Sequence, residues 1–509
     1  MSRSRLSPAA LAVLGAALLF FLFLGYATPY SPVDDLQWGM EEGLRWWLGG
    51  LLNRRYVGNF FAVVMCRSPL AKTLLMGLGM FALPLLMALV AGWGTKNALL
   101  PAFCFCCGGL LFMSSQTWRE TFCWVCGLGN YVVSILFFLV WLLLLLRSET
   151  ARTHLGLWSA GLFLLALSSG LFLENQTLLN LGLALLLTLR ALARRRGRLL
   201  ALASLAGAAL ALVPMFFNQI LTDMLSTGSA LNELRQFTFS LEDGLWAAAL
   251  AVLREYFTAL LPLGLSFGLY LAVPSAILTA CALWRSPLRP LAVLGVVPLV
   301  CGWWCVTQEG PLPLWAASCL CWFLPGIALL LERAPRSEKG FRLLLYLAAP
   351  LSLLPVAAIN TRGGRLFLFP LVMLLLAAAR TAAPLLERRA VALLAAGAMV
   401  GLMALWGSRY WVVLSCTSLR DDLIAQSIDT GRSPLVLPTD RYQHTVWWSR
   451  NCWDVECADW FRRFYHIPDH ITLIFLPPRS YETWPEISEE QWAGRIELAP
   501  SKDFVPSLP

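Results

Sequence analysis

The chain has 509 residues, of which 58% are apolar and only 14% are charged. An ordinary soluble chain is about 45–50% apolar and about 25% charged, so a soluble fold of this length could not bury its apolar surface, and a soluble enzyme is excluded. The net charge of +9 does not indicate a nucleic-acid partner, because a membrane protein divides its charges between two sides. The class that remains is an all-α polytopic membrane protein, since apolar runs of about 20 residues recur where a membrane β-barrel would alternate apolar and polar residues.

The apolar runs predict about 13 transmembrane helices. The first run, 8–28, follows Arg3 and Arg5 and lacks a small-residue cleavage site, so we interpret it as an uncleaved helix and not as a signal peptide. A further apolar stretch, 245–261, contains Arg254 and Glu255, which predicts a helix at the membrane interface instead of a span. The later spans are expected near 70–93, 99–115, 131–146, 155–173, 178–192, 199–217, 260–284, 291–306, 312–331, 343–359, 366–385 and 390–406.

The positions of Lys and Arg predict the orientation. With the N-terminus in the cytoplasm, nearly every short basic loop falls on the cytoplasmic side, and the loop after Ile359 is the exception. The opposite side then receives a first loop over 29–69, two further loops over 116–130 and 218–256, and a tail that begins at Gly407. The first loop contains an amphipathic stretch, which predicts a juxtamembrane helix.

Two domains are expected, a transmembrane domain over 1–406 and an extracytoplasmic domain over 407–509. The tail is less apolar than the rest of the chain, and two short strand-like runs, 433–437 and 471–475, flank a helix-like stretch at 458–465. We therefore expect a small C-terminal α/β domain that docks on the membrane domain.

The 14 cysteines indicate no metal or redox centre in the membrane domain, because most of them lie inside apolar runs, where Cys acts as a small hydrophobic residue. In the tail, Cys452 and Cys457 would face an oxidising compartment, so a disulfide between them is an open alternative, with Cys416 as a competing partner. The sequence has no Gly-rich nucleotide loop and no Cys-pair metal motif.

Charged and polar residues gather at the helix ends of the predicted outer face, although a charge at membrane depth costs about 2.5–3.5 kcal/mol. A carboxylate there can take a proton from an attacking hydroxyl, and an Arg can hold a phosphate through two hydrogen bonds. Adjacent acids repel each other, which raises the pKa of one of them toward that of a useful base. Transfer of a sugar from a lipid phosphate to an alcohol needs both groups. The charged residues are Asp34, Asp35, Arg55, Arg119, Glu120, Glu174, Arg362 and Arg365.

Structural roles for the same residues stay open at this point. Asp is a favoured N-cap, so Asp34 and Asp35 could serve only to start the juxtamembrane helix. The Arg side chains could extend to lipid headgroups, and Glu174 could form a structural ion pair with one of them.

The order of four motifs resembles the GT-C superfamily of membrane glycosyltransferases, and more particularly bacterial O-antigen glucosyltransferase-type membrane proteins. The resemblance covers roughly the first 180 residues and a patch near Arg362. The motifs are Asp34-Asp35, Arg55-Tyr56-Val57-Gly58-Asn59, Trp124-Val125-Cys126-Gly127-Leu128-Gly129-Asn130-Tyr131 and the late Arg362 or Arg365.

The resemblance implies a hexosyltransferase in the bacterial cytoplasmic (inner) membrane, with its C-terminal domain in the periplasm. Its partners would be a polyprenyl-phosphate-sugar donor and an envelope glycan or lipid acceptor, and the transfer would invert the anomeric carbon. Asp34 would be the base, and Asp35 would orient the acceptor or substitute for Asp34. The donor phosphate would be bound by Arg55, Arg119, Arg362 and Arg365, and the substrates by Tyr56, Glu120, Asn130, Tyr131 and Glu174.

No cofactor is expected. A divalent metal is not favoured, because the resemblance rests on one di-acid, Asp34-Asp35, and offers no clear second carboxylate cluster, although Glu120 and Glu174 could assemble one. Two other functions remain as alternatives. A lipid-linked glycan flippase or transporter would place ionisable groups near span centres, and an O-antigen polymerase or ligase would share the outer Arg residues but needs no early di-acid. A membrane scaffold for the tail would not need so many spans.

Overall fold

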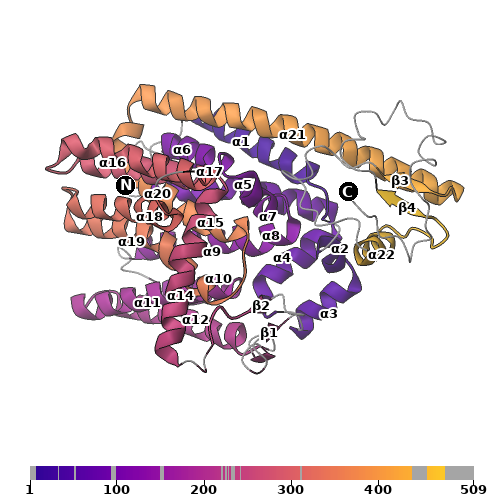
Figure 1. The fold of residues 1–509 in the computed structure, drawn as a ribbon, viewed down its shortest axis with the longest axis horizontal. Helices are drawn as coiled ribbons and strands as arrows, with labels where there is room; N and C mark the ends of the chain where they lie inside the picture. Colours follow the sequence, from indigo (N-terminus) through magenta and orange to yellow (C-terminus); the bar gives the residue numbers. More distant parts are fainter. Residues whose placement is uncertain are drawn as a thin grey trace.

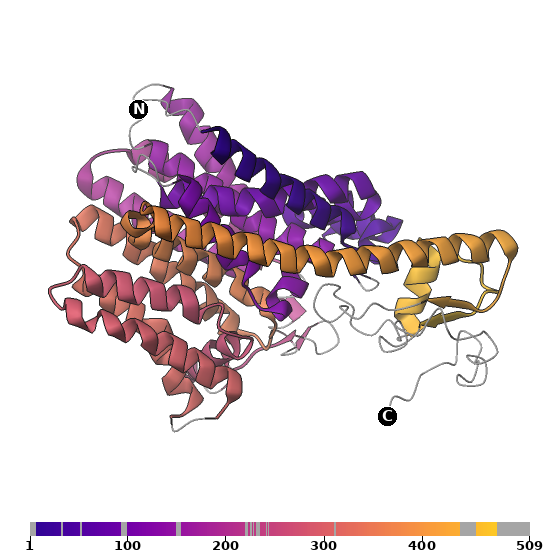
Figure 2. The ribbon, with the colours of Figure 1, turned by 90° about the horizontal axis from the view of Figure 1, so that it is seen from above.

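The computed structural model describes residues 7–31, 34–50, 53–92, 99–148, 154–218, 222–223, 226, 229–230, 235–240, 242, 244–309, 312–437 and 455–475. In this part of the chain, eleven helices are long and apolar enough to cross a membrane, or up to twelve if one bent pair counts as a span. Most of them run along the long axis of the molecule (Figures 1 and 2). The protein is therefore an all-α polytopic membrane protein, with a number of spans close to the 13 that the apolar runs predict.

The spans consist of single helices or of helices joined end to end. The N-termini of α1 and α5 show why they begin where they do, since a Ser N-cap accepts a hydrogen bond from the first turn and a Pro follows it. The candidate spans are α1 (Pro8–Ala27), α5 (Pro69–Ala91), α8 (Val125–Gly127) with η1 (Leu128–Val132) and α9 (Val133–Ser148), α11 (Glu174–Arg194), α12 (Arg198–Phe216), α14 (Leu245–Glu255) with η2 (Tyr256–Leu260) and α15 (Leu261–Ser266), η3 (Arg289–Val296) with α17 (Val297–Thr307), α18 (Leu314–Leu331), α19 (Arg336–Leu353) with η4 (Leu354–Ala358), η5 (Gly364–Phe367) with α20 (Leu368–Leu386), and α21 (Arg389–Thr430).

Shorter elements fill the ends of the bundle. The bent pair, α6 and α7, turns by 98°. The amphipathic stretch expected in the first loop forms two short helices, α2 and α3, followed by the apolar α4. The shorter elements are α2 (Asp34–Gly39), α3 (Glu41–Gly49), α4 (Tyr56–Arg67), α6 (Leu99–Leu111), α7 (Ser115–Thr121), α10 (Leu155–Gly170), α16 (Ala272–Trp284) and an antiparallel ribbon of β1 (Ser229–Ala230) and β2 (Arg235–Gln236).

The span expected over 260–284 is wrong, because the helix breaks between Ser266 and Ala272. Gly268 lies in this break with a φ of 138°, a backbone conformation that favours glycine. The first part of the segment joins α14 in one apolar stretch of 22 residues, long enough to span. In Figure 1, however, α14 runs across the direction of the other helices, which is the orientation that an interfacial helix requires.

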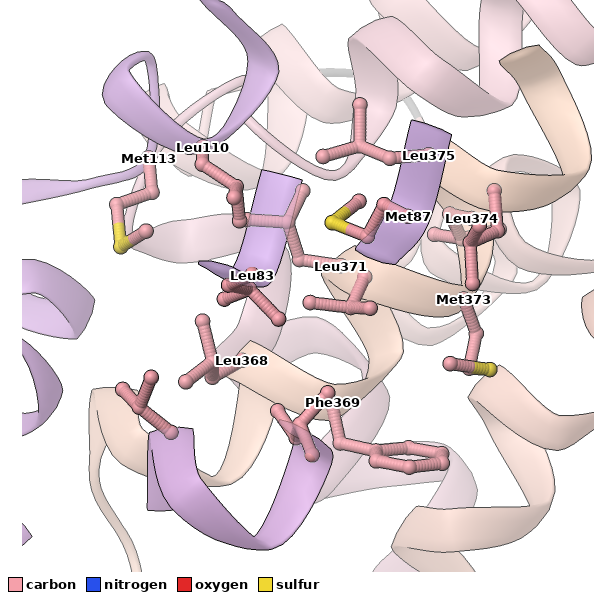
Figure 3. Packing of buried hydrophobic residues seen from close by; sticks show 14 of the residues in the cluster. Leu83, Met87, Leu110, Met113, Leu368, Phe369, Leu371, Met373, Leu374 and Leu375 are labelled. Carbon is pink, nitrogen blue, oxygen red and sulfur yellow. The ribbon is translucent and has the colours of Figure 1, made fainter. Parts of the chain in front are cut away.

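The core of the bundle lies around α20. In the span formed by η5 and α20, 89% of the apolar window is buried, whereas the corresponding share for α21 is 11%. Figure 3 shows Leu371 and Leu375 of α20 among Leu83 and Met87 of α5 and Leu110 of α6. The central position of α20 fixes the place of the loop that precedes it, which contains Arg365.

Helix α21 lies along the outside of the bundle and extends beyond it (Figures 1 and 2). It has 42 residues, and at 1.5 Å per residue it is about 63 Å long, about twice the hydrocarbon thickness of a bilayer. The domain boundary expected between 406 and 407 therefore falls inside a continuous helix, which ends only at Thr430.

The end of α21 carries a small β-α-β unit, which we call the C-terminal unit. It consists of the parallel strands β3 (Leu435–Leu437) and β4 (Leu473–Phe475) and of α22 (Val455–Phe464), close to the expected positions. Leu36 of α2 lies in its apolar core together with Phe461 and Ile471. The C-terminal unit is thus packed against the helix that begins with the di-acid. Cys452 lies outside the described residues, as does the side chain of Cys457, so their pairing stays open.

Candidate functional site

A cavity of about 530 Å³ lies where the first loop, the start of α8–η1, the start of α11 and the segment around η5 meet. This volume is within the range of small-molecule sites, about 300–1,000 Å³. Apolar residues of the lining come from the ends of α11 and α12 and from η4. Six residues that the sequence singled out also line the cavity: Asp34, Arg55, Asn130, Tyr131, Glu174 and Arg365.

Asp34 is the first residue of α2 and lines the cavity. Its half-buried carboxylate has no hydrogen bond or ion pair to any other residue that the structure describes. Burial and the adjacent Asp35 raise the pKa of Asp34 from 3.8 to about 6, while the positive charge of Arg365 opposes the rise. Asp34 is therefore a carboxylate with a free face toward the cavity and a pKa close to neutral pH.

Asp35 has a different role, although it is the next residue. It is fully buried, is not among the residues that line the cavity, and accepts hydrogen bonds from three backbone amides. Its Oδ2 accepts from Ser31 at 2.8 Å and from Val125 at 3.3 Å, and its Oδ1 accepts from Cys126 at 2.9 Å. The last two amides begin α8, whose N-cap residue, Trp124, supplies no side-chain bond. The structure thus places Asp35 as an anchor between the first loop and α8, not beside the acceptor as expected.

Arg55 and Glu174 form the ion pair that was one of the open alternatives. The Nε of Arg55 lies 3.3 Å from Oε1 of Glu174, and its Nη2 lies 2.7 Å from Oε2. Both residues line the cavity, and both are mostly buried. This pair joins the residue that precedes α4 to the first residue of α11, and it neutralises one positive and one negative charge of the cavity wall.

Arg55 and Arg365 are the two arginines in the described lining of the cavity, and Arg365 has fewer protein partners than Arg55. Its buried Nε has no hydrogen-bond partner within the described chain, and its Cζ lies 5.7 Å from the centre of the Trp124 ring. Its backbone N–H donates to Oε2 of Glu120 at 3.2 Å. Glu120 is buried and does not line the cavity. Its position suits a residue that holds the segment of Arg365, whereas the resemblance predicted that it would bind a substrate.

The paired glycines before Arg365 allow this segment to pack closely on α7. A Cβ at Gly364 would lie 2.7 Å from the backbone N of Thr117, and a Cβ at Gly363 would lie 2.6 Å from Oε2 of Glu120. Any side chain there would displace the loop. The two glycines therefore allow the backbone of this segment to lie close to α7.

Besides Asp35 and Glu120, three more of the predicted site residues lie outside the cavity lining. Arg119 donates from Nη2 to Oε1 of Gln116 at 2.7 Å. Arg362 is 58% exposed and pairs with Glu255 at 2.8 Å. Tyr56 starts α4, and its carbonyl accepts from Nε1 of Trp47 at 2.8 Å. The expectation that Arg119 and Arg362 hold the donor phosphate is thus not supported by their positions.

Asn130 lines the cavity and has a buried acceptor that is not used within the described chain. Its Nδ2 donates to the carbonyl of Cys126 at 3.0 Å, while its buried Oδ1 has no partner among the described residues. Gly58 makes room for it, since a Cβ there would lie 2.2 Å from that Oδ1. A buried acceptor without a partner is costly unless a ligand or water supplies a donor.

The sequence reasoning missed several residues of the wall. Trp124 was noted only as part of a motif. Trp38 and Asn53 lie in the first loop and Asn218 follows α12, and none of these three was singled out. Asn53 organises the entrance to α4, since its Oδ1 accepts from the backbone of Arg55 at 3.2 Å and from Nδ2 of Asn59 at 2.9 Å. A turn before a motif is the signal that could have indicated Asn53.

One group in the described chain has metal-ligand types close together, namely Asp35, Cys66 and Cys126. The two sulfur atoms lie 3.9 Å apart. Both oxygens of Asp35 already accept backbone hydrogen bonds, so this group acts as a packed anchor. Glu120 and Glu174 bind other parts of the protein, namely the backbone N–H of Arg365 and the side chain of Arg55.

Comparison of the chain with family models, with curated proteins and with solved structures gave no significant match.

Proposed function

We propose that the protein is an inverting membrane glycosyltransferase of the GT-C type. It moves a hexose from a polyprenyl-phosphate-sugar to an envelope glycan or lipid, at the face of the membrane to which the cavity belongs. The distribution of Lys and Arg supports a position of that face on the non-cytoplasmic side, which in this proposal is the periplasmic side of a bacterial inner membrane.

The observation that carries this proposal is that Asp34 and Arg365 line the same cavity. Asp34 has no hydrogen bond or ion pair to another described residue, and Arg365 has a buried Nε without an acceptor. The two groups are near enough for their charges to interact. A base and a phosphate-binding cation, in a cavity that also has an apolar lining, match the parts of a polyprenyl-phosphate-sugar and its acceptor.

The reaction requires one displacement. The acceptor hydroxyl gives its proton to the Asp34 carboxylate while its oxygen forms a bond to the anomeric carbon. The bond between that carbon and the phosphate oxygen breaks, and its electron pair stays on the polyprenyl phosphate. The guanidinium of Arg365 stabilises the added negative charge on the phosphate.

The remaining wall residues suit the sugar and the lipid chain. Trp38, Trp124 and Tyr131 offer rings to the apolar face of a hexose, and the Oδ1 of Asn130 can accept from a sugar hydroxyl. The apolar part of the lining, which includes Leu178, suits the first isoprenoid units of the lipid chain.

The charges also bear on the alternatives. A flippase or transporter would place its ionisable groups near the middle of the spans. In the described cavity, Asp34 begins α2, Glu174 begins α11 and Arg365 lies in η5, so all three are at helix ends. This arrangement favours a reaction at one face over passage through the bundle.

The test uses the full chain in nanodiscs, with polyprenyl-phosphate-glucose labelled in the sugar and bacterial envelope membranes as the acceptor. The wild type is expected to label the acceptor fraction, and Asp34→Asn is expected to lower transfer by about 10²–10⁴-fold, because the amide cannot take the proton. Asp422→Asn is the matched control, since it makes the same change at an exposed position of α21 and should leave transfer unchanged.

Unchanged transfer by Asp34→Asn at equal protein level would remove the base from the mechanism. If the wild type moves the intact labelled lipid to the other leaflet without labelling the acceptor, the protein is a flippase and the proposal is wrong.

A further inference from the structure

A second cavity, of about 450 Å³, lies at the other end of the bundle, around the turn between α11 and α12. Four arginines line it: Arg190, Arg194, Arg196 and Arg198. Glu174 at the start of α11 lines the first cavity, and α11 has 21 residues, so the two cavities are separated by about 30 Å along its axis. This separation equals the hydrocarbon thickness of a bilayer, which places the second cavity at the opposite membrane surface.

The backbone of the turn brings these side chains to one opening. The N–H of Arg195 donates to the carbonyl of Leu192, and that of Arg196 donates to the carbonyl of Ala191, which closes α11 with a Schellman turn. Arg195 and Gly197 both have positive φ values, 55° and 64°. The chain therefore reverses within three residues, and α12 starts with Arg198 directly beside the end of α11.

The arginines of the second cavity differ from other arginines at the same end of the bundle. Arg285 and Arg342 pair with Glu332, and Arg380 pairs with Glu338. In contrast, no ion pair joins any of the four cavity arginines to an acid in the part of the chain that the structure describes. Four cations of like charge around one opening repel one another, and a bound anion would remove that repulsion.

The rest of the lining is apolar and comes from four helices. It includes Leu145 of α9, Leu155 of α10, Leu187 of α11 and Leu199 of α12. Leu155 and Leu199 are 42% and 56% exposed, so the cavity opens toward the surface that faces lipid. A cationic rim joined to apolar walls fits a ligand that is itself amphipathic.

We propose that this second cavity binds the phosphodiester headgroup of an anionic diacyl phospholipid, with an acyl chain along the leucines. Guanidinium groups form paired hydrogen bonds with phosphate oxygens. Basic pockets between membrane helices are the usual form of such sites. A small soluble anion would use the arginines but would leave the apolar walls without a partner, so the phospholipid accounts for more of the cavity.

The experiment measures lipid binding to the full chain by native mass spectrometry in detergent. The protein is titrated with phosphatidylglycerol and, separately, with phosphatidylcholine of the same acyl chains. Phosphatidylglycerol is expected to bind more tightly. The variant Arg190→Ala/Arg194→Ala/Arg198→Ala is expected to lose on the order of 100-fold in affinity for it, since each arginine near a headgroup contributes about fivefold.

The matched control is Arg195→Ala/Arg388→Ala/Arg389→Ala. It removes the same number of charges at the same end of the bundle, from exposed residues that do not line the cavity. It should keep the affinity for phosphatidylglycerol within about twofold. An equal loss in both variants would overturn the proposal, because the effect would then depend on net charge alone. Displacement of the lipid by millimolar inorganic phosphate would also overturn it, in favour of a small-anion site.

Discussion

The side chain of Arg55 holds Glu174 through two hydrogen bonds, of 3.3 and 2.7 Å, across the wall of the first cavity. The two residues are 119 positions apart in the sequence. Their pairing ties the first loop to the start of α11, and among the described arginines that line this cavity it leaves Arg365 without an ion pair. This one contact therefore distinguishes Arg55, which is paired, from Arg365, which is not.

Breaking the Arg55–Glu174 pair should destabilise the fold. Arg55→Ala leaves the carboxylate of Glu174 without its partner, and because the two side chains are 14% and 29% exposed, we expect a loss of about 1–3 kcal/mol, less than for a fully buried pair. Thermal unfolding of the protein in detergent measures it. The exchange Arg55→Glu/Glu174→Arg should recover a large part of the loss, and the absence of any recovery would contradict a direct pair.

Transfer should depend on the protonation of Asp34. The raised pKa of about 6 means that the carboxylate is protonated at lower pH and ionised at higher pH. Because only the ionised form can act as a base, the single-turnover rate should fall as the pH drops through about 6, by about a factor of ten for each further pH unit. A rate profile over this range checks the prediction. A midpoint near 3.8, the ordinary value, would show that burial and Asp35 do not affect the base.

The adjacent carboxylate should matter for stability more than for chemistry. Asp35→Ala would leave the amides of Ser31, Val125 and Cys126 without their acceptor in a buried place, at a cost of about 1–3 kcal/mol for each unsatisfied group. We expect a low yield of folded protein and a lower melting temperature, measured by fluorescence-detected size exclusion. Asp35→Asn keeps one acceptor oxygen and should be milder. It also removes a charge that helps to raise the pKa of Asp34, so in the protein that folds the midpoint of the pH dependence of transfer should shift to lower pH.

The two late arginines should behave differently. Arg365→Ala removes a charge-assisted hydrogen bond to the donor phosphate, worth about 1.5–3 kcal/mol, and should raise the KM for polyprenyl-phosphate-glucose by roughly 10- to 100-fold. Arg362→Ala should leave the KM within about twofold, because Arg362 is exposed and paired with Glu255. Steady-state kinetics decide the point, and equal effects of the two changes would contradict the assignment of the phosphate to Arg365.

The C-terminal unit should support the site through α2. Leu36 is 1% exposed, and it packs against Phe461 only two residues after Asp34. Leu36→Ala should cost about 2–5 kcal/mol of stability and lower kcat by displacing Asp34. Its control is Leu437→Ala, which removes a similar side chain from the same apolar core but outside α2. A drop in kcat specific to Leu36→Ala supports a positioning role for α2, and equal drops would show only general destabilisation.

Most of the spans could be predicted, because an apolar run of about 20 residues is a local signal. The predictions fail where tertiary packing or a single backbone conformation determines where a helix ends. The break after Ser266 contains Gly268 in a backbone conformation that favours glycine, and α21 continues to Thr430 and contacts β3 of the C-terminal unit. Hydropathy reports burial in lipid and not the continuity of a helix, so it marks neither feature.

The sequence by itself determined the class of protein and the helix ends at which charged residues gather, since burial of apolar surface and the cost of charge in a bilayer act residue by residue. It could not determine which of those residues share a cavity. Asp34 and Asp35 are neighbours, but successive residues of a helix point about 100° apart, so one faces the cavity and the other faces α8. Asp35 is the one that faces α8 because it binds a backbone amide 90 residues away, and only the tertiary structure brings this amide and Asp35 together.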